Sequence, residues 1–194
     1  VSVRPGERIR LRLVNTSNGR VYRPDLSGLD AHIIALDGMY TARPLPPDGL
    51  ELAPGNRADL DITIPMDAGG SVMTIEDRFT RRPIRLANLR VRGEPVPTPR
   101  FEPPSNPRVP RWDGARDLAV DVTYELDARS GGPHGIQWTI NGTAWGDHEP
   151  TQLPAGRWTR VRFANRSGRL RPMHIHGQFC RVIERNGEPV DEPY

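Results

Sequence analysis

Residues 6–17 read Gly6-Glu7-Arg8-Ile9-Arg10-Leu11-Arg12-Leu13-Val14-Asn15-Thr16-Ser17, and the fold class follows from this stretch. Apolar residues alternate with arginines from residue 8 to residue 13. Side chains of an extended strand point to opposite faces of a sheet in turn, so this alternation predicts one apolar face and one charged face. A strand of this kind is half buried, with its charged face toward solvent.

Further short apolar segments follow, separated by turns that are rich in proline and glycine. None has the roughly 3.6-residue period of an amphipathic helix. Short strands between such turns predict an all-β protein arranged as an antiparallel sandwich. The predicted strands lie at residues 31–36, 58–65, 71–76, 84–91, 118–124 and 137–140.

A proline-rich segment separates the strands into two groups. Residues 93–111 contain seven prolines and few large apolar side chains, which predicts an extended, semi-rigid linker rather than part of a core. We therefore predict a first domain at residues 1–92, a linker at residues 93–112 and a second domain at residues 113–194.

The two predicted domains are copies of one β-module. A shift of 150 residues places the quoted stretch on residues 156–167 without a gap. After one deletion the shift becomes 149, so that Gly28 meets Gly177 and Gly38 meets Gly187. Self-similarity at a fixed offset indicates tandem domains of one fold. The identical pairs in the ungapped stretch are Gly6/Gly156, Arg10/Arg160, Arg12/Arg162, Asn15/Asn165 and Ser17/Ser167.

The second copy carries a pair of histidines that the first copy lacks. Asp25-Leu26-Ser27-Gly28 stands in the first copy where His174-Ile175-His176-Gly177 stands in the second. On an extended strand His174 and His176 would share one face, and imidazole is a ligand for copper, zinc, iron and nickel. A lone His-x-His is more often two ordinary histidines. Because the first copy folds without them, we interpret this pair as metal ligands.

The remaining histidines are weaker candidates for a site. His32 lies on an apolar predicted strand, where a core or interface histidine is expected. His134 and His148 lie in predicted loops, and an isolated metal-binding module would need one of them near the pair. The single Cys180 excludes an internal disulfide.

The charge pattern argues against a nucleic-acid partner. All 27 basic residues are arginines, and they are balanced by 24 acids and scattered through strands and loops rather than clustered with exposed aromatics. The chain is 36% hydrophobic, which is enough for a core. No window reaches the run of about 18 apolar residues that a membrane span needs, so we expect no membrane span.

In combination these motifs resemble the multicopper oxidases, the laccase-like enzymes built from tandem cupredoxin domains. The resemblance implies two tandem cupredoxin-like Greek-key β-sandwich domains, both incomplete. The first is similar to the middle domain, which has no copper ligands, and the second to the first part of the last domain. The segments that carry the resemblance are residues 4–15, 36–38 and 53–59 in the first half, and residues 138–142, 162–167 and 172–177 in the second.

The resemblance also assigns roles by position. The family motif is His-Pro-x-His-x-His-Gly, whose first histidine binds the type 1 copper and whose other two belong to the trinuclear cluster that reduces dioxygen to water. By this match His174 would bind the type 2 copper and His176 a type 3 copper. Arg171 occupies the type 1 position, and a guanidinium has no lone pair to offer. Cys180 is not the electron-transfer cysteine of the family, and we expect a small core residue there.

The function implied is part of a copper-dependent oxidoreductase that couples oxidation of an unknown reducing substrate to reduction of dioxygen to water. The other copper ligands would come from a missing first domain or another subunit, and from a His-Cys-His segment after Tyr194. An alternative stays open: a non-enzymatic, cupredoxin-like binding or scaffold module that has lost its type 1 copper. The resemblance further implies a periplasmic or extracellular location.

Overall fold

The structure is a computed structural model that describes residues 1–104, 113–144, 146–147 and 149–193. Contacts between residues divide the chain into two units, one of Val1–Val109 with Ile175–Tyr194 and one of Pro110–His174. The three-part division from the repeat and the linker stays a prediction. Residues 105–112 of the predicted linker, and His148, lie outside the described residues.

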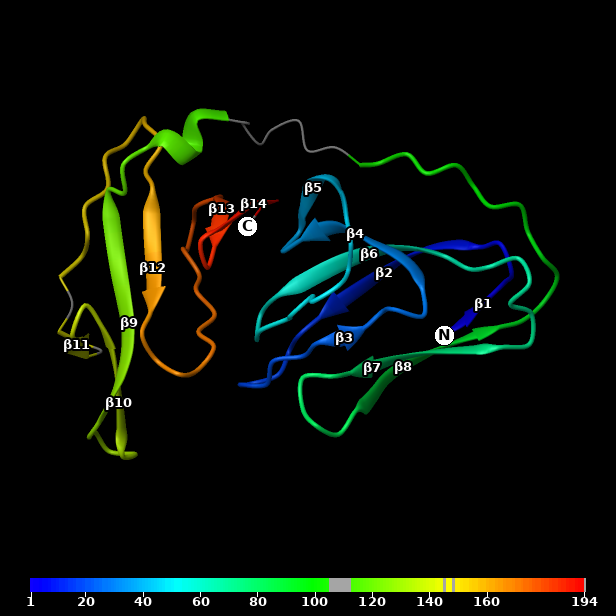
Figure 1. The fold of residues 1–194 in the computed structure, drawn as a ribbon, viewed down its shortest axis with the longest axis horizontal. Helices are drawn as coiled ribbons and strands as arrows, with labels where there is room; N and C mark the ends of the chain where they lie inside the picture. The colour runs from blue at the N-terminus through cyan, green and yellow to red at the C-terminus, as the bar shows by residue number, and fades with distance from the viewer. Residues whose placement is uncertain (105–112, 145, 148, 194) are drawn as a thin grey trace. The chain divides into compact units, whose positions relative to one another are not determined.

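Strands dominate both units (Figure 1). The described residues contain one short 3-10 helix, η1 at Asp113–Asp117, and no α-helix. This confirms the predicted all-β class. Across the same residues, no helix has the length and apolar character that crossing a membrane would require.

The first unit is built around two four-stranded sheets. One has the order β1-β8-β7-β3 and the other the order β2-β6-β4-β5. Neighbouring strands are antiparallel except for β1 and β8, which are parallel. The strands are β1 (Ser2–Val3), β2 (Arg8–Val14), β3 (Pro24–Asp25), β4 (Asp30–Leu36), β5 (Met39–Leu45), β6 (Arg57–Thr63), β7 (Val72–Asp77) and β8 (Ile84–Val91).

Apolar side chains from both sheets share one core between them. Leu60 and Ile62 of β6 and Leu89 and Val91 of β8 are fully buried in it. Removing such side chains from water is the main favourable contribution to folding. The other buried members from the strands are Val3, Ala31, Ile33, Ala58 and Ile75.

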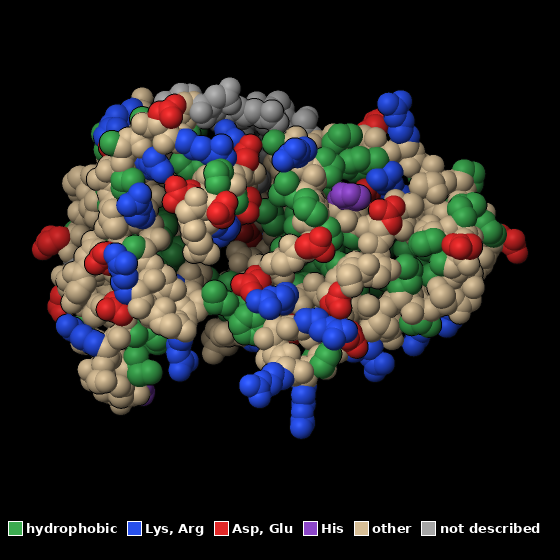
Figure 2. All heavy atoms as spheres, in the orientation of Figure 1, with side chains coloured by type: hydrophobic (Ala, Val, Ile, Leu, Met, Phe, Trp, Pro, Cys, Tyr) green, Lys and Arg blue, Asp and Glu red, His purple; other side chains and the backbone are tan. Residues whose placement is uncertain are grey.

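The alternation of β2 is confirmed by its pairing with β6. Ile9 lies opposite Ile62 and Leu11 opposite Leu60, on the side of the core. The arginines of β2 lie on the other face, where Arg10 and Arg12 both donate hydrogen bonds to Asp59. Figure 2 shows basic and acidic side chains intermixed over the visible surface.

Asp59 is only 3% exposed, so its charge depends on those two arginines. Burial raises the pKa of Asp59, but the hydrogen bonds from Arg12 and Arg10 outweigh burial and leave the pKa below its usual value. A buried carboxylate is tolerated in a sheet when it is paired and hydrogen-bonded in this way.

The second unit contains a sheet of order β11-β10-β9-β12, in which β12 runs parallel to β9 and the other pairs are antiparallel. Its strands are β9 (Val122–Ser130), β10 (Ile136–Ile140), β11 (Thr143–Ala144) and β12 (Val161–Asn165). The strand predicted at residues 118–124 therefore begins later, at the first residue that pairs with β12. The hairpin of β13 (Arg181–Arg185) and β14 (Glu188–Pro193) belongs to the first unit, where β14 lies beside β5.

The two copies of the repeat share local structure. Asn15 Nδ2 donates to Arg20 O at 2.7 Å, and Asn165 Nδ2 donates to Arg169 O at 2.7 Å. The turn from Asn15 to Arg20 is one residue longer than the turn from Asn165 to Arg169. The deletion that changes the offset between the copies from 150 to 149 therefore lies inside this turn. The hairpin turns match as well: φ is 47° and 90° at Asp37-Gly38, and 53° and 86° at Asn186-Gly187.

Asp77, at the end of β7, is fully buried and accepts hydrogen bonds from three residues. Its Oδ1 accepts hydrogen bonds from Arg23 N at 2.9 Å and Phe79 N at 3.0 Å, and its Oδ2 accepts one from Arg20 Nη2 at 2.6 Å. Burial raises the pKa of Asp77, but these hydrogen bonds outweigh burial, so the pKa lies below its usual value.

We predict that Asp77→Ala lowers the free energy of unfolding by about 2–3 kcal/mol, because it leaves two backbone N–H groups and a guanidinium without their acceptor. Urea unfolding followed by circular dichroism measures this change. Asp67→Ala, at an exposed position, is the matched control and should change the value by less than about 0.5 kcal/mol. Equal effects of the two substitutions would contradict the assigned role.

We also predict that the protein loses stability in acid. The pKa values of Asp59 and Asp77 are lowered in the folded state. Each carboxylate therefore contributes stability that is fully present above its unfolded pKa of about 3.9 and is lost as the pH falls through the folded pKa. Urea midpoints measured from neutral pH downward should decline below about pH 4–5. Asp77→Ala should decline less, and a parallel decline would argue against this linkage.

Candidate metal centre

The segment that carries the histidine pair is not a strand. Residues 170–175 form no strand, and His176 and Gly177 form a turn in which φ of Gly177 is +76°. The strand expected across His174 and His176 is therefore wrong.

The first copy shows the physical reason. There, β3 exists because Pro24 and Asp25 pair with Asp77 and Glu76 of β7. A strand needs such a hydrogen-bonded neighbour. In the second copy, no described strand pairs with residues 170–176.

Exposure nevertheless alternates along this segment. His174 and His176 are exposed, whereas Arg171, Met173 and Ile175 between and before them are half-buried. A period of two is the pattern of an extended chain. Both imidazoles thus stand at the exposed positions of the alternation, and neither is sealed in an apolar core.

The same positions in the first copy bring their side chains together. Ser27 Oγ donates to Asp25 Oδ1 at 2.6 Å, and Ser27 N donates to the same oxygen at 3.1 Å. Side chains two residues apart therefore reach each other at this point of the β-module. The imidazoles of His174 and His176 occupy the equivalent positions of the second copy.

The donor set suits copper but is small. Imidazole nitrogen is a good copper ligand, and the two histidines supply two donors. Among the residues that the structure describes, no group of three or more His, Cys, Asp or Glu side chains is placed to hold a metal ion. The pair therefore fits part of a copper site, whose other ligands would have to come from elsewhere.

The other sequence candidates lie in different settings. His32 is exposed on β4, opposite Asp61 of β6, and His134 lies in the exposed loop between β9 and β10. Cys180 is half-buried, and burial raises the pKa of its thiol. Metal binding requires the thiolate, so this shift disfavours Cys180 as a ligand.

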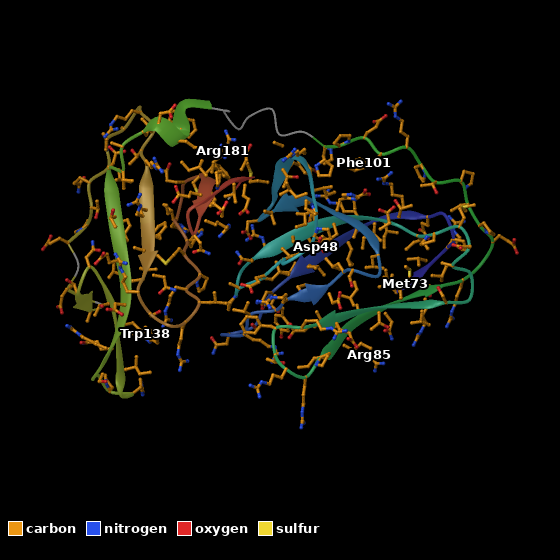
Figure 3. The ribbon with its side chains drawn as sticks, in the orientation of Figure 1. Asp48, Met73, Arg85, Phe101, Trp138 and Arg181 are labelled. Atoms are coloured by element: carbon orange, nitrogen blue, oxygen red, sulfur yellow. The ribbon has the colours of Figure 1, made fainter. Side chains whose placement is uncertain are left out.

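Arg171 makes a contact that sequence reasoning missed. Its guanidinium carbon lies 3.2 Å from the centroid of the Trp138 ring, and its Nη2 is buried without a hydrogen-bond acceptor among the described residues. Figure 3 labels Trp138, which belongs to β10 of the second unit. Nothing in the sequence links these two residues, which lie on segments far apart in the chain. The contact fixes a permanent cation three residues before His174 in the sequence.

Two family models, both described as multicopper oxidase, match the chain over residues 1–82 and residues 117–194. Together they cover more than four fifths of its length. The chain belongs to the multicopper oxidase family. Copper is the cofactor of that family, and the predicted cupredoxin-like β-sandwich fold is confirmed.

Nearly the whole chain aligns with part of individual multicopper oxidases. Multicopper oxidase MmcO of Mycobacterium tuberculosis (strain ATCC 25618 / H37Rv) is 27% identical over an alignment of 194 positions, which covers 96% of this chain and 38% of MmcO. The crystal structure of a multi-copper oxidase from Pseudomonas thermotolerans is 25% identical with a TM-score of 0.69, covering 100% of this chain and 47% of that one. The chain thus spans less than half the length of each.

A second curated relative, similar over a shorter segment, is named as a cell division protein and not as an oxidase. Cell division protein FtsP of Sodalis glossinidius is 43% identical over 65 residues, which are 33% of this chain and 13% of that protein. Similarity to this chain is therefore not confined to proteins that are named as oxidases.

We predict that substitutions at the half-buried and exposed positions of residues 174–176 change the free energy of unfolding by different amounts. Ile175→Ala should lower the free energy of unfolding by about 1–2 kcal/mol, because a half-buried apolar side chain is lost. His174→Ala and His176→Ala, at the exposed positions, should each change it by less than about 0.5 kcal/mol. Urea unfolding of the three variants provides the measurement. A larger loss from either histidine than from Ile175 would give the histidines a structural role.

Proposed function

We propose that this chain is part of a copper-dependent oxidoreductase and contributes His174 and His176 to a trinuclear copper cluster. One observation carries the proposal: the two imidazoles stand at exposed positions whose first-copy counterparts touch at 2.6 Å, in a chain of the multicopper oxidase family. Imidazoles that shared this placement would be able to bind one ion or two adjacent ions.

Within this proposal His174 would bind the type 2 copper and His176 a type 3 copper. His174 and His176 would hold copper, and bound copper would supply the electron transfer to dioxygen. The reducing substrate would be oxidised elsewhere in the parent protein. Further ligands would come from another domain or subunit. Export to the periplasm or the cell exterior belongs to the same proposal and rests on the family resemblance.

A second candidate function is a non-enzymatic binding or scaffold module with the same fold. Arg171 favours it, because a guanidinium stacked on Trp138 at 3.2 Å cannot serve as a copper ligand at the type 1 position. The likeness to cell division protein FtsP over 65 residues also favours it. Retention of both histidines favours the enzyme.

Copper titration of the 194-residue chain tests the first proposal. We predict that His174→Ala combined with His176→Ala raises the dissociation constant for Cu²⁺ at least about tenfold, because both imidazole donors are lost. The matched control combines His32→Ala with His134→Ala, which removes two exposed imidazoles that have no assigned role. Isothermal titration calorimetry measures each dissociation constant.

The outcomes separate the candidates. Equal copper affinity in the wild type and the His174/His176 double variant would remove the site from this pair. A folded chain without measurable copper binding favours the scaffold module. The bound copper should give no intense blue absorption, because that band needs a cysteine thiolate in a type 1 site. Reading the gene past the codon for Tyr194 adds an independent check, since the enzyme requires a His-Cys-His segment there.

A further inference from the structure

We infer that residues 92–101 form a strap docked on the first unit, and that Arg8 is the clamp that holds the strap in place. The strap includes the first half of the predicted linker. This inference is independent of copper binding.

The backbone of the strap continues the pairing of β1 with β8. Arg92 N donates to Val3 O at 2.8 Å, and Val96 N donates to Pro5 O at 2.9 Å. Prolines at positions 95, 97 and 99 have no N–H to donate. The amide of Val96 is therefore one of few in the strap that can report on docking.

Gly6 permits the close approach of the strap. A Cβ atom at this position would lie 2.0 Å from Val96 O, a distance that no side chain can occupy. Gly156, its counterpart in the second copy, has the same φ of +76° but nothing within 4 Å of such a Cβ. The turn accounts for the positive φ of both glycines. At Gly6 the strap also requires that there is no side chain.

Arg8 joins the strap to the sheet through three different contacts. Its Nε and Nη2 donate to the two carboxylate oxygens of Asp61 at 2.7 and 2.5 Å, which fixes the plane of the guanidinium. Its Nη1 donates to Pro99 O at 3.3 Å. Its flat face lies over the ring of Phe101, with the guanidinium carbon 4.4 Å from the centroid. Figure 3 labels Phe101 at the end of the strap.

These contacts need a guanidinium rather than any cation. A lysine ammonium at the same position would offer one point charge and no flat face, so it could not hold Asp61, Pro99 and Phe101 together. The second copy carries Trp158 at this position, which shows that the β-module itself does not require an arginine there. The clamp is thus a device of the first copy.

A proline-rich segment is already extended and loses little conformational entropy when it docks.

Hydrogen exchange of the Val96 amide tests the clamp in the 194-residue chain, with the Leu60 amide of β6 as the reference for global unfolding. We expect Arg8→Ala and Arg8→Lys to raise the exchange rate of Val96 relative to Leu60 by about tenfold or more, since a charge-assisted bond and a stacking contact are lost. Arg8→Lys keeps a cation beside Asp61 and so guards against misfolding. Arg12→Ala, on the same strand face but bonded to Asp59, should leave the ratio unchanged.

A second pair of variants separates the strap from backbone strain. Gly6→Ala and Gly156→Ala place a methyl group at the same φ, and we expect only Gly6→Ala to raise the relative exchange of Val96. An unchanged ratio in both Arg8 variants would overturn the clamp. An equal rise in Arg12→Ala, or in Gly156→Ala, would overturn it as well.

Discussion

The pairing of β2 with β6 is the constraint on which the first unit depends. Its apolar side presents Leu60 and Ile62 to the core, and its polar side buries the carboxylates of Asp59 and Asp61 beneath the arginines of β2. The apolar face and the charged face of this strand pair each depend on the other for stability. A buried carboxylate without its cation would cost several kcal/mol, and a strand without its apolar face would not be held on the sheet. One residue of slippage would exchange the two faces, so the ion pairs and the core select the same register.

The repeat shows which features belong to the module and which were added to each copy. Both copies keep the asparagine that closes its turn onto a backbone oxygen, and both keep the Asx-Gly hairpin turn. These features serve folding. Arg8 in the first copy, and His174 with His176 in the second, have no counterpart in the other copy. A fold hosts functions as sites placed upon it, so these two departures are the candidates for copy-specific roles.

Sequence alternation predicted the strands that pair along their whole length. Residues 84–91 match β8, and residues 58–65 contain most of β6, because both strands lie inside their sheets. Strand β5 was missed because it is an edge strand whose Arg43 and Pro44 break the apolar pattern. The strand expected at His174 failed because alternation reports side-chain direction and not the presence of a neighbouring strand. The contacts of Arg8 with Phe101 and of Arg171 with Trp138 join distant segments, and no local pattern encodes them.

Arg171 constrains the enzyme proposal and leaves the scaffold proposal unconstrained. Stacked on Trp138, it places a permanent cation where the family resemblance puts the type 1 copper ligand. A cluster that used His174 and His176 would then have to receive electrons by a route other than a type 1 copper at this position. A binding module has no such requirement, and there the cation would simply cover an aromatic surface. The two proposals thus agree on the fold. They differ in whether the imidazole pair holds copper, and so metal affinity, more directly than oxidase activity, distinguishes them.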